Sequence, residues 1–423
     1  MKKHYLIRLF MVVLVSMFFM QCAEDPQKSL YELDPTYSQK PDPIITKVEP
    51  AAGAYAGISE VTITGTNFDP SENYSHTRVY FGGKKAQINS MTSDEIICIA
   101  PVIAGDSLLV KVQVDGATLF GVSEPYKLEY AQKDYGGITG AFNAYGLAVD
   151  LDENLYVSLG EGKILKVTPE EEQIDYLTSE QGVDGFYKAM KMGPNKTLFT
   201  ARTVFIYQFP EGGTGTRARM TKSINDFDFD ENLNIFYATK FAVYTLPSQN
   251  LADKIDRLVA DYPDYILNAL RVYNGYVYVA GSYNGTSADS VQKGVWRNQI
   301  LNSTGDLGPK ELVFDWESYF GAATVGIPNI LSMTFAEDGD LYLGADSTLI
   351  SDAIMAIHPN GSGQYLPENA EPLFPAVLMP PATTLCWGAG QYLYVNRRNV
   401  SDDLKRVVRV TMGKNSAPYY GRR

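Results

Sequence analysis

The sequence YGLAVDLDENLYV occupies residues 145–157, and the apolar run ILKV follows at residues 164–167. Apolar side chains alternate with other residues on both sides of the segment DLDEN, which is the pattern of two β-strands joined by a tight turn. Asp and Asn are residues that such turns select. Residues 145–167 are therefore expected to form three consecutive antiparallel strands.

The same pattern recurs five more times between residues 131 and 423. In each copy an apolar residue precedes a strand aromatic by six or seven positions: Val149/Tyr156, Met192/Phe199, Phe229/Phe236, Val272/Tyr278, Phe335/Tyr342 and Trp387/Tyr394. Each first strand begins with a small or short residue, which suits strands that converge on a narrow axis: Gly146, Ala189, Asp226, Ala269, Ser332 and Thr384. Six copies of about 49 residues each fit four-stranded blades. We therefore expect an all-β fold with a six-bladed β-propeller over residues 131–423.

The first copy resembles the NHL repeat family, and the segment DGDLY at residues 338–342 in the fifth copy is similar to it. The other copies match loosely, and Ser158, Leu159 and Lys163 replace the Asp and Arg that often close the NHL motif. The resemblance implies the propeller architecture and no particular function. An α/β domain is the alternative, but strands and helices do not alternate, and a helical pattern occurs only at residues 251–262.

Residues 43–130 carry short apolar runs separated by Gly, Pro, Asn and Asp, which is typical of an immunoglobulin-like β-sandwich. The runs VTITG at 61–65 and RVYFGG at 78–83 occur in the order found in the IPT/TIG family, which this segment resembles. Gly65 and Asn67 are expected in a tight turn with left-handed backbone. The resemblance implies a spacer or a protein-contact domain.

The N-terminus has the pattern of an export signal. Basic residues within positions 1–8 precede an apolar run at 9–20, which is shorter than the ~20 residues of a membrane-spanning helix. Cys22 and the acidic residues after it resemble the surface-export lipoprotein signals of Bacteroidetes. The resemblance implies a signal peptide at 1–21, lipidation of Cys22 and a tether at 22–42. The expected location is the outer face of an outer membrane.

The chain holds 36 basic and 49 acidic residues, a formal charge of −13 that becomes −16 when residues 1–21 are removed. This balance argues against nucleic acid and anionic lipid as partners, because both are bound through basic patches. Cysteines and histidines lack metal-ligand spacing, and the Asp-rich segments read as hairpin turns without the EF-hand pattern. No metal or cofactor is expected. Because nucleophile elbows and phosphate loops are also absent from the sequence, it does not predict an enzyme.

Many of the 29 Tyr, 19 Phe and 3 Trp residues fall at strand positions that the repeat places in blade cores. A smaller set lies out of phase, mostly in connections near one mouth of the propeller. Loops on a rigid scaffold commonly carry binding residues, and sugars stack on aromatic rings while Asn binds their hydroxyls. The residues expected to form a binding platform are Phe186, Tyr187, Asn225, Tyr265, Asn268, Tyr283, Trp316, Tyr319, Phe320 and Asn329.

The expected function is non-catalytic capture of a glycan or oligosaccharide at the propeller mouth. Proteins that resemble this arrangement occur beside SusC/SusD-type uptake systems, so transporter proteins of that type are the expected partners. The negative charge favours neutral glycans or proteins as ligands. Two alternatives stay open: an accessory subunit that docks on a transporter or another lipoprotein, and a propeller lyase or hydrolase.

Overall fold

The computed structural model describes residues 39–248, 251, 255–287, 290–321, 326–346, 352–375, 377–398 and 400–422. The expected signal peptide, Cys22 and most of the expected tether lie outside these residues. The chain divides into two compact units, one formed largely by residues 60–99 and 107–126 and the other largely by residues from Lys127 onward. Each unit is described by itself. Among the described residues, no helix has the length and apolar character needed to span a membrane.

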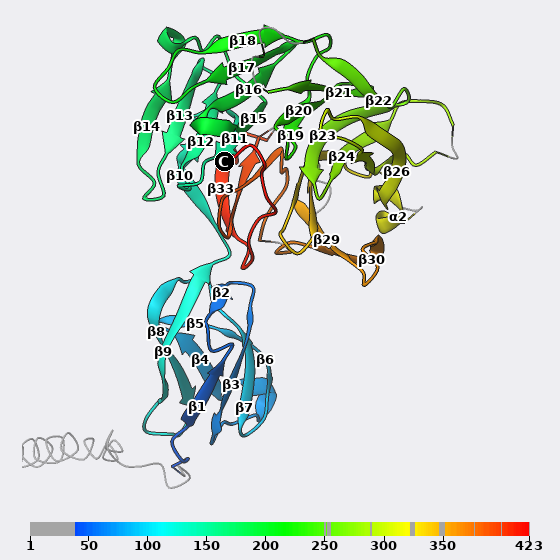
Figure 1. The fold of residues 1–423 in the computed structure, drawn as a ribbon. Coiled ribbons are helices and arrows are strands. Elements are labelled where there is room, and N and C mark those ends of the chain that lie inside the picture. The colour runs from blue at the N-terminus through cyan, green and yellow to red at the C-terminus, as the bar shows by residue number, and fades with distance from the viewer. Residues whose placement is uncertain are drawn as a thin grey trace, which may run out of the picture. The chain divides into compact units, whose positions relative to one another are not determined.

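The first unit is a β-sandwich of two sheets (Figure 1). One sheet has the order β1 (Ile44–Glu49), β3 (Glu60–Thr66), β7 (Glu95–Ile99), β6 (Gln87–Met91). The other has the order β2 (Ala54–Ala56), β9 (Gly121–Tyr130), β8 (Gly105–Val114), β4 (Thr77–Phe81), β5 (Lys84–Lys85), and a 3₁₀ turn covers Glu72–Tyr74. Alternate side chains of both sheets, such as Val61, Ile63 and Phe81, are fully buried and form the core.

Gly65 and Asn67 end strand β3 for two different reasons. Asn67 has a φ of 65°, the left-handed backbone expected for it. Gly65 does not have a positive φ, so that part of the expectation is wrong. A Cβ at Gly65 would lie 2.0 Å from the carbonyl oxygen of Ile44, so the position requires glycine because two backbones approach closely.

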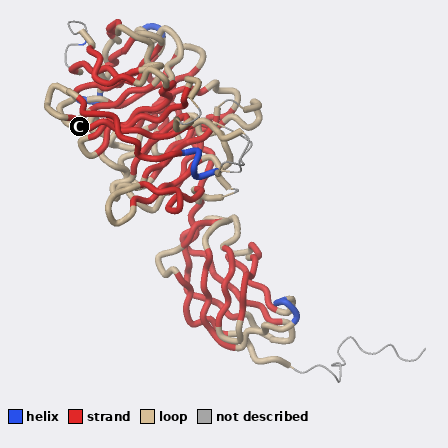
Figure 2. The backbone as a smooth tube through the Cα atoms, turned by 90° about the vertical axis from the view of Figure 1, so that its right-hand side faces the viewer, coloured by secondary structure: helices blue, strands red, loops and turns tan. Residues whose placement is uncertain are grey.

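The described part of the second unit contains six four-stranded sheets, which we number as blades 1 to 6. Strands make up most of this unit (Figure 2). Blades 1 and 2 are β11 (Ala144–Val149), β12 (Leu155–Leu159), β13 (Lys163–Val167), β14 (Gln173–Leu177) and β15 (Ala189–Met192), β16 (Leu198–Arg202), β17 (Phe205–Phe209), β18 (Thr216–Arg219). Blades 3 and 4 are β19 (Asp226–Phe229), β20 (Asn234–Ala238), β21 (Ala242–Pro247), β22 (Arg257–Asp261) and β23 (Tyr265–Tyr273), β24 (Tyr276–Tyr283), β25 (Lys293–Ile300), β26 (Leu307–Asp315). Blade 5 is β27 (Ile330–Phe335), β28 (Leu341–Ala345), β29 (Ile354–Pro359), β30 (Tyr365–Pro372).

Blade 6 closes the ring with strands from both ends of the unit. It consists of β31 (Thr384–Trp387), β32 (Tyr392–Arg397) and β33 (Arg406–Thr411), and its outer strand is β10 (Gln132–Thr139) (Figure 1). Each first strand contacts the first strands of its two neighbours, including β31 with β11. The side chain of Asn396 seals the junction by donating to the carbonyl oxygens of Ala144 and Tyr145. This ring of six blades is a β-propeller, so the expected all-β fold class is confirmed.

The repeat phase read from the sequence matches the strands. In blade 1, Val149 ends the first strand and pairs with Leu155, beside the buried aromatic ring of Tyr156. The turn between them is held by Asp150, which accepts hydrogen bonds from the side chains of Asn154 (2.9 Å) and Tyr156 (2.9 Å). The Asp-rich segment of blade 1 is therefore a structural turn, as expected.

The helix expected at residues 251–262 is wrong within the described part of that segment. Arg257–Asp261 form strand β22, which pairs antiparallel with β21. The helical spacing of the segment is overridden by the free edge of β21, which offers unpaired backbone groups to the next segment. A short helix does occur elsewhere, α2 (Trp316–Phe320), whose N-terminus is capped by the side chain of Asp315.

Candidate ligand-binding pocket

A pocket of about 810 Å³ lies where the six first strands of the blades begin, and we call this end the open mouth. Every first strand contributes to its lining: Tyr145 from β11, Ala189 from β15, Asp226 from β19, Asn268 from β23, Ser332 from β27 and Thr384 from β31. Four of these are short residues that the sequence pattern places where the strands converge. Their small volume leaves room for the pocket on the propeller axis.

The lining of the pocket is rich in basic side chains: Lys188, Lys191, Arg202, Lys240 and Arg398. Among the described lining residues Asp226 is the only acidic one. Lys188, Lys240 and Arg398 form no ion pair with any carboxylate in the described parts of the chain. The pocket is therefore positive, although the whole chain carries a formal charge of −13.

The two arginines among these cations are held against aromatic rings. The ring of Tyr145 stacks on that of Phe186, with centroids 3.9 Å apart and an interplanar angle of 19°. The guanidinium of Arg398 lies 3.5 Å from the centroid of Tyr145, so Phe186 and Arg398 cover opposite faces of that ring. The guanidinium of Arg202 lies 5.6 Å from the centroid of Phe186. Cation–π contacts of this kind orient a guanidinium, and that of Arg398 has no hydrogen-bond partner in the described chain.

The deeper part of the pocket contains a buried ion pair. Nζ of Lys191 lies 3.8 Å from Oδ1 of Asp226, and both side chains are largely buried. Burial raises the pKa of Asp226, while Lys191 and the backbone amides of Leu270 and Phe227 act in the opposite direction. The amides donate to the Asp226 oxygens at 2.9 Å each, so this carboxylate is fully engaged by the protein.

The opposite end of the propeller axis is occupied by residues 412–422, which we call the C-terminal segment. It contacts the residues that end the first strands: a Cβ on Gly421 would lie 2.5 Å from the carbonyl oxygen of Met192, and the amide of Ala417 donates to the carbonyl of Phe335. The ring of Tyr419 lies 3.4 Å from the buried guanidinium of Arg271, which is paired with Asp228. We call this end the closed end.

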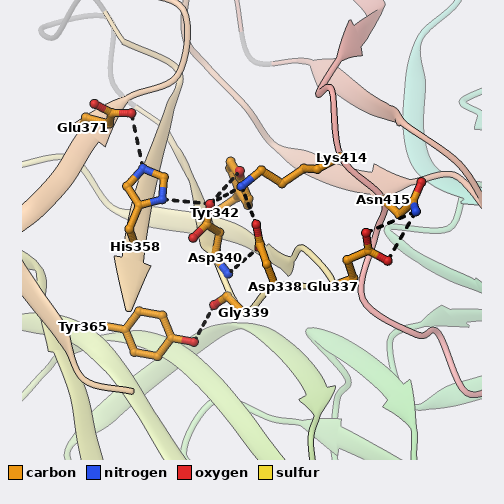
Figure 3. Close-up of polar contacts among 10 residues, drawn as sticks. All are labelled: Glu337, Asp338, Gly339, Asp340, Tyr342, His358, Tyr365, Glu371, Lys414 and Asn415. Atoms are coloured by element: carbon orange, nitrogen blue, oxygen red, sulfur yellow. Dashed lines mark hydrogen bonds and ion pairs between the residues drawn. The ribbon is translucent and has the colours of Figure 1, made fainter. Parts of the chain in front are cut away.

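The C-terminal segment is fastened to blade 5 by polar contacts (Figure 3). Nζ of Lys414 bridges the carboxylates of Asp338 and Asp340. On the other side of Asp340, Nδ1 of His358 approaches its Oδ2 at 2.8 Å, and Nε2 of His358 lies 3.3 Å from Glu371. Lys414 of the segment is therefore neutralised by two carboxylates, whereas three of the five basic side chains at the open mouth have no carboxylate partner in the described chain.

Three of the residues expected at a binding site line the pocket: Phe186, Asn225 and Asn268. The side chain of Asn225 donates to the carbonyl of Leu267 at 2.7 Å, and that of Asn268 donates to the carbonyl of Ile330 at 3.1 Å. Each amide therefore ties its own blade to the next one, and its position on the wall of the pocket is fixed. Their amide oxygens accept no hydrogen bond from a described residue.

Four expected platform residues belong to core clusters or pack against them instead. Trp316 is 1% exposed and donates from Nε1 to the carbonyl of Pro328, while Tyr319 and Phe320 pack against the same core cluster. Tyr187 is 0% exposed, with its hydroxyl 3.4 Å from Asp184. A buried ring cannot stack on a ligand, so the platform expectation is wrong for Trp316 and Tyr187. Tyr319 and Phe320 are not pocket residues, because the short helix α2 turns them onto blades 4 and 5.

Tyr265, Tyr283 and Asn329 also lie outside the pocket lining. The ring of Tyr265 packs on the rings of Trp296 and Tyr283 within blade 4, with centroid distances of 4.4 Å and 5.3 Å. The side chain of Asn329 donates to Asp346 at 2.7 Å. These three side chains serve the contacts within and between blades, and the single platform expected from the sequence does not form.

The basic residues of the open mouth and Tyr145 were missed in the sequence. A signal for three of them exists in the repeat: Arg202, Lys240 and Arg398 follow the second-strand aromatics Phe199, Phe236 and Tyr394 by three or four positions. The same positions in the other blades hold no basic residue. Extending the alignment of the six copies past the strand aromatic would have predicted that these cations lie at the same end of their blades.

Metal or thiol chemistry is not indicated in the described parts of the chain. Among those residues, no group of three or more His, Cys, Asp or Glu side chains is placed to hold a metal ion. Cys98 and Cys386 are both buried and unpaired. Burial raises the pKa of Cys98 to about 12 and also raises that of Cys386, so neither is a reactive thiolate at neutral pH.

Comparison with known families identifies the first unit. The family model of the IPT/TIG domain matches residues 43–130. These residues are an IPT/TIG domain. The immunoglobulin-like domain expected from the sequence is thereby confirmed. Among curated proteins, Fibrocystin-L of Mus musculus is 28% identical over 131 residues, which are 31% of this chain and 3% of that protein.

One of the solved structures that match this chain has a TM-score above 0.5. A putative phosphatase from Bacteroides thetaiotaomicron matches with a TM-score of 0.55 and 13% identity, covering 88% of this chain and 97% of that one. An auxiliary nutrient binding protein from Bacteroides ovatus matches with a TM-score of 0.47 and 17% identity, covering 89% and 99%. At this level of identity the first likeness concerns the fold alone.

Proposed function

We propose that this protein is a cell-surface lipoprotein that captures an oligosaccharide, without catalysis, in the pocket at the open mouth of its propeller. The observation that carries the proposal is the pocket itself: about 810 Å³, lined by all six first strands. Ligand-binding pockets commonly have volumes of about 300–1,000 Å³ with a few fixed polar groups. The C-terminal segment occupies the other end of the axis, so ligand would enter from the open mouth.

The polar lining supports a sugar as ligand. The side chains of Asn225, Asn268 and Thr384 line the wall at fixed positions, and each is held by a hydrogen bond to a carbonyl of a neighbouring blade. Sugar hydroxyls both donate and accept, so they suit amide and hydroxyl groups with remaining hydrogen-bonding capacity. In this proposal the captured oligosaccharide passes to an uptake system of the SusC/SusD type.

The first experiment is glycan binding by the full-length protein purified in mild detergent. Affinity electrophoresis against a broad polysaccharide panel, followed by calorimetry on oligosaccharides of each hit, should find a ligand. Ser223→Trp, which places a large ring on the exposed pocket rim, should weaken binding at least tenfold. Ser179→Trp is the matched control, because Ser179 is also exposed but lies outside the lining. Absence of binding to every glycan would overturn the proposal.

The lipid anchor is tested separately. Metabolic labelling with a radioactive fatty acid should label the wild-type chain and not the Cys22→Ser variant. Surface location follows if added protease degrades the protein in intact cells. Pull-down on the native anchor then separates the alternatives: co-purification of a transporter without any glycan affinity would favour the accessory-subunit function over capture.

A further inference from the structure

We infer that the ligand of the open-mouth pocket is an acidic oligosaccharide, one whose carboxylate or sulfate groups are bound by Arg398, Arg202, Lys188 and Lys240. The inference rests on the proposed function and specifies its substrate class. It differs from the expectation of a neutral ligand, which came from the net charge of the whole chain. The charge of the pocket, five basic side chains against one acidic, has the opposite sign.

The first argument is that the cations of the mouth are not neutralised by the protein. Lys191 is paired with Asp226 and Arg202 with Asp184, at 3.8 Å and 3.3 Å. Lys188, Lys240 and Arg398 have no carboxylate partner in the described residues. A chain with an excess of acidic residues has enough carboxylates to pair these cations, and it pairs Lys414 twice at the closed end. Three unpaired cations around one pocket are a site for an anion.

The second argument is the geometry of Arg398. Its guanidinium carbon lies 3.5 Å from the centroid of the Tyr145 ring, and Phe186 stacks on the other face of the same ring. Neither face of Tyr145 is therefore open to a sugar. The ring pair instead holds Arg398 in place and leaves the edge of its guanidinium without a hydrogen-bond partner in the described chain. A planar fork of this kind binds a carboxylate or sulfate through two parallel hydrogen bonds.

The third argument is the contrast between the pocket and the remainder of the chain. The formal charge of −13 repels anions from most of the surface, while the cations of the mouth attract them. Charges at the rim mainly raise the association rate and make binding dependent on ionic strength. Asn225 and Asn268, on the same wall, supply the uncharged contacts that a sugar ring needs and that a bare inorganic anion does not use.

The test compares acidic polysaccharides with their neutralised counterparts. The full-length protein is run in affinity electrophoresis against polygalacturonate, alginate, carrageenan and chondroitin sulfate, together with the same polymers after carboxyl reduction or desulfation and with neutral arabinan, xyloglucan and dextran. We expect retardation by at least one acidic polymer and at least tenfold weaker binding of its neutralised form in calorimetry. Polygalacturonate and alginate carry only carboxylates and carrageenan carries only sulfates, so comparing their binding shows which of the two groups the pocket recognises. Raising NaCl from 0.15 to 0.5 M should weaken binding severalfold.

Variants assign the effect to the pocket. Arg398→Ala should weaken binding of the acidic ligand at least tenfold, which is about 1.4 kcal/mol. Arg398→Lys keeps the charge and loses the fork, so it should recover only part of this loss. Arg219→Ala is the matched control, an exposed arginine outside the lining that should bind like wild type. Equal affinity for acidic and neutralised forms, or full binding by Arg398→Ala, would overturn this inference and leave oligosaccharide capture standing. Absence of binding to every polymer would instead overturn the proposed function.

Discussion

The two ends of the propeller axis are built from the same six strands and differ in how their charges are used. At the closed end, Lys414 binds two carboxylates, and Asp228 is paired with the buried Arg271. At the open mouth, Lys188, Lys240 and Arg398 have no carboxylate partner in the described chain. The six strands alone therefore do not determine whether the charged side chains at an end are paired. The closed end pairs Lys414 and Arg271 with carboxylates, and the open mouth leaves three of its five basic side chains without a carboxylate partner in the described chain.

The largest expected effect comes from breaking the buried pair at the closed end. Asp228→Ala leaves the guanidinium of Arg271, 1% exposed, without its carboxylate. Removing one partner of a buried ion pair typically costs about 3–5 kcal/mol. Chemical denaturation should show a loss of that size. If Asp228→Ala unfolds at the same denaturant concentration as wild type, the closed end does not stabilise the propeller through this pair.

The next effect concerns the C-terminal segment itself. Tyr419 contacts Arg271 through its ring, and its hydroxyl lies 2.9 Å from that of Thr334 and 3.3 Å from the amide of Trp387. Tyr419→Ala removes these contacts and should cost about 2 kcal/mol. Tyr419→Phe keeps the ring, so it should cost about 1 kcal/mol for the lost hydrogen bonds. Equal midpoints for both variants and wild type in thermal denaturation would contradict a fastening role for Tyr419.

A smaller effect depends on pH through His358. Burial acts to lower its pKa, but hydrogen bonds and charge from Asp340 and then Glu371 outweigh burial and raise it above 6.5. Because the folded-state pKa is the higher one, protonated His358 stabilises the protein below about pH 6.5, and this contribution is lost as the pH rises through the folded-state value. The side chain is 42% exposed, so we expect less than about 0.5 kcal/mol. Denaturation curves at pH 5.5 and 8.5 should differ less in His358→Gln than in wild type.

The smallest effect on stability is expected at the open mouth. Lys188→Ala and Lys240→Ala remove exposed cations that have no carboxylate partner in the described chain, so neither should shift the unfolding midpoint measurably. Each should weaken binding of an acidic oligosaccharide about three- to fivefold and reduce the dependence of affinity on salt. A marked loss of stability in either variant would show that the mouth cations support the fold, and the contrast between the two ends would disappear.

The local sequence pattern was sufficient to predict the blades and insufficient to predict the residues of the pocket. The alternation that ends at Val149 and resumes at Tyr156 is a property of neighbouring residues, so it predicted the first two strands of each blade and, in blade 1, the turn held by Asp150. The helix predicted at residues 251–262 is wrong because the spacing of apolar residues there is ambiguous. Pairing with the edge of β21 decided the structure of this segment. The predicted binding role is wrong for the out-of-phase aromatics Tyr187 and Trp316, because both side chains turn into the core. Sequence periodicity does not indicate whether a loop side chain points inward or outward.

The sequence by itself determined the all-β architecture, the IPT/TIG domain and the six repeats of the propeller, because each was predicted from a pattern of residues close along the chain. Only the tertiary structure decided that β10 completes blade 6, that the C-terminal segment occupies one end of the axis, and that Arg202, Lys240 and Arg398 meet at the other. Ring closure brings together residues that are tens to hundreds of positions apart. The net charge of a chain is a sum over all residues, and it does not predict the sign of a pocket to which each blade contributes only a few side chains.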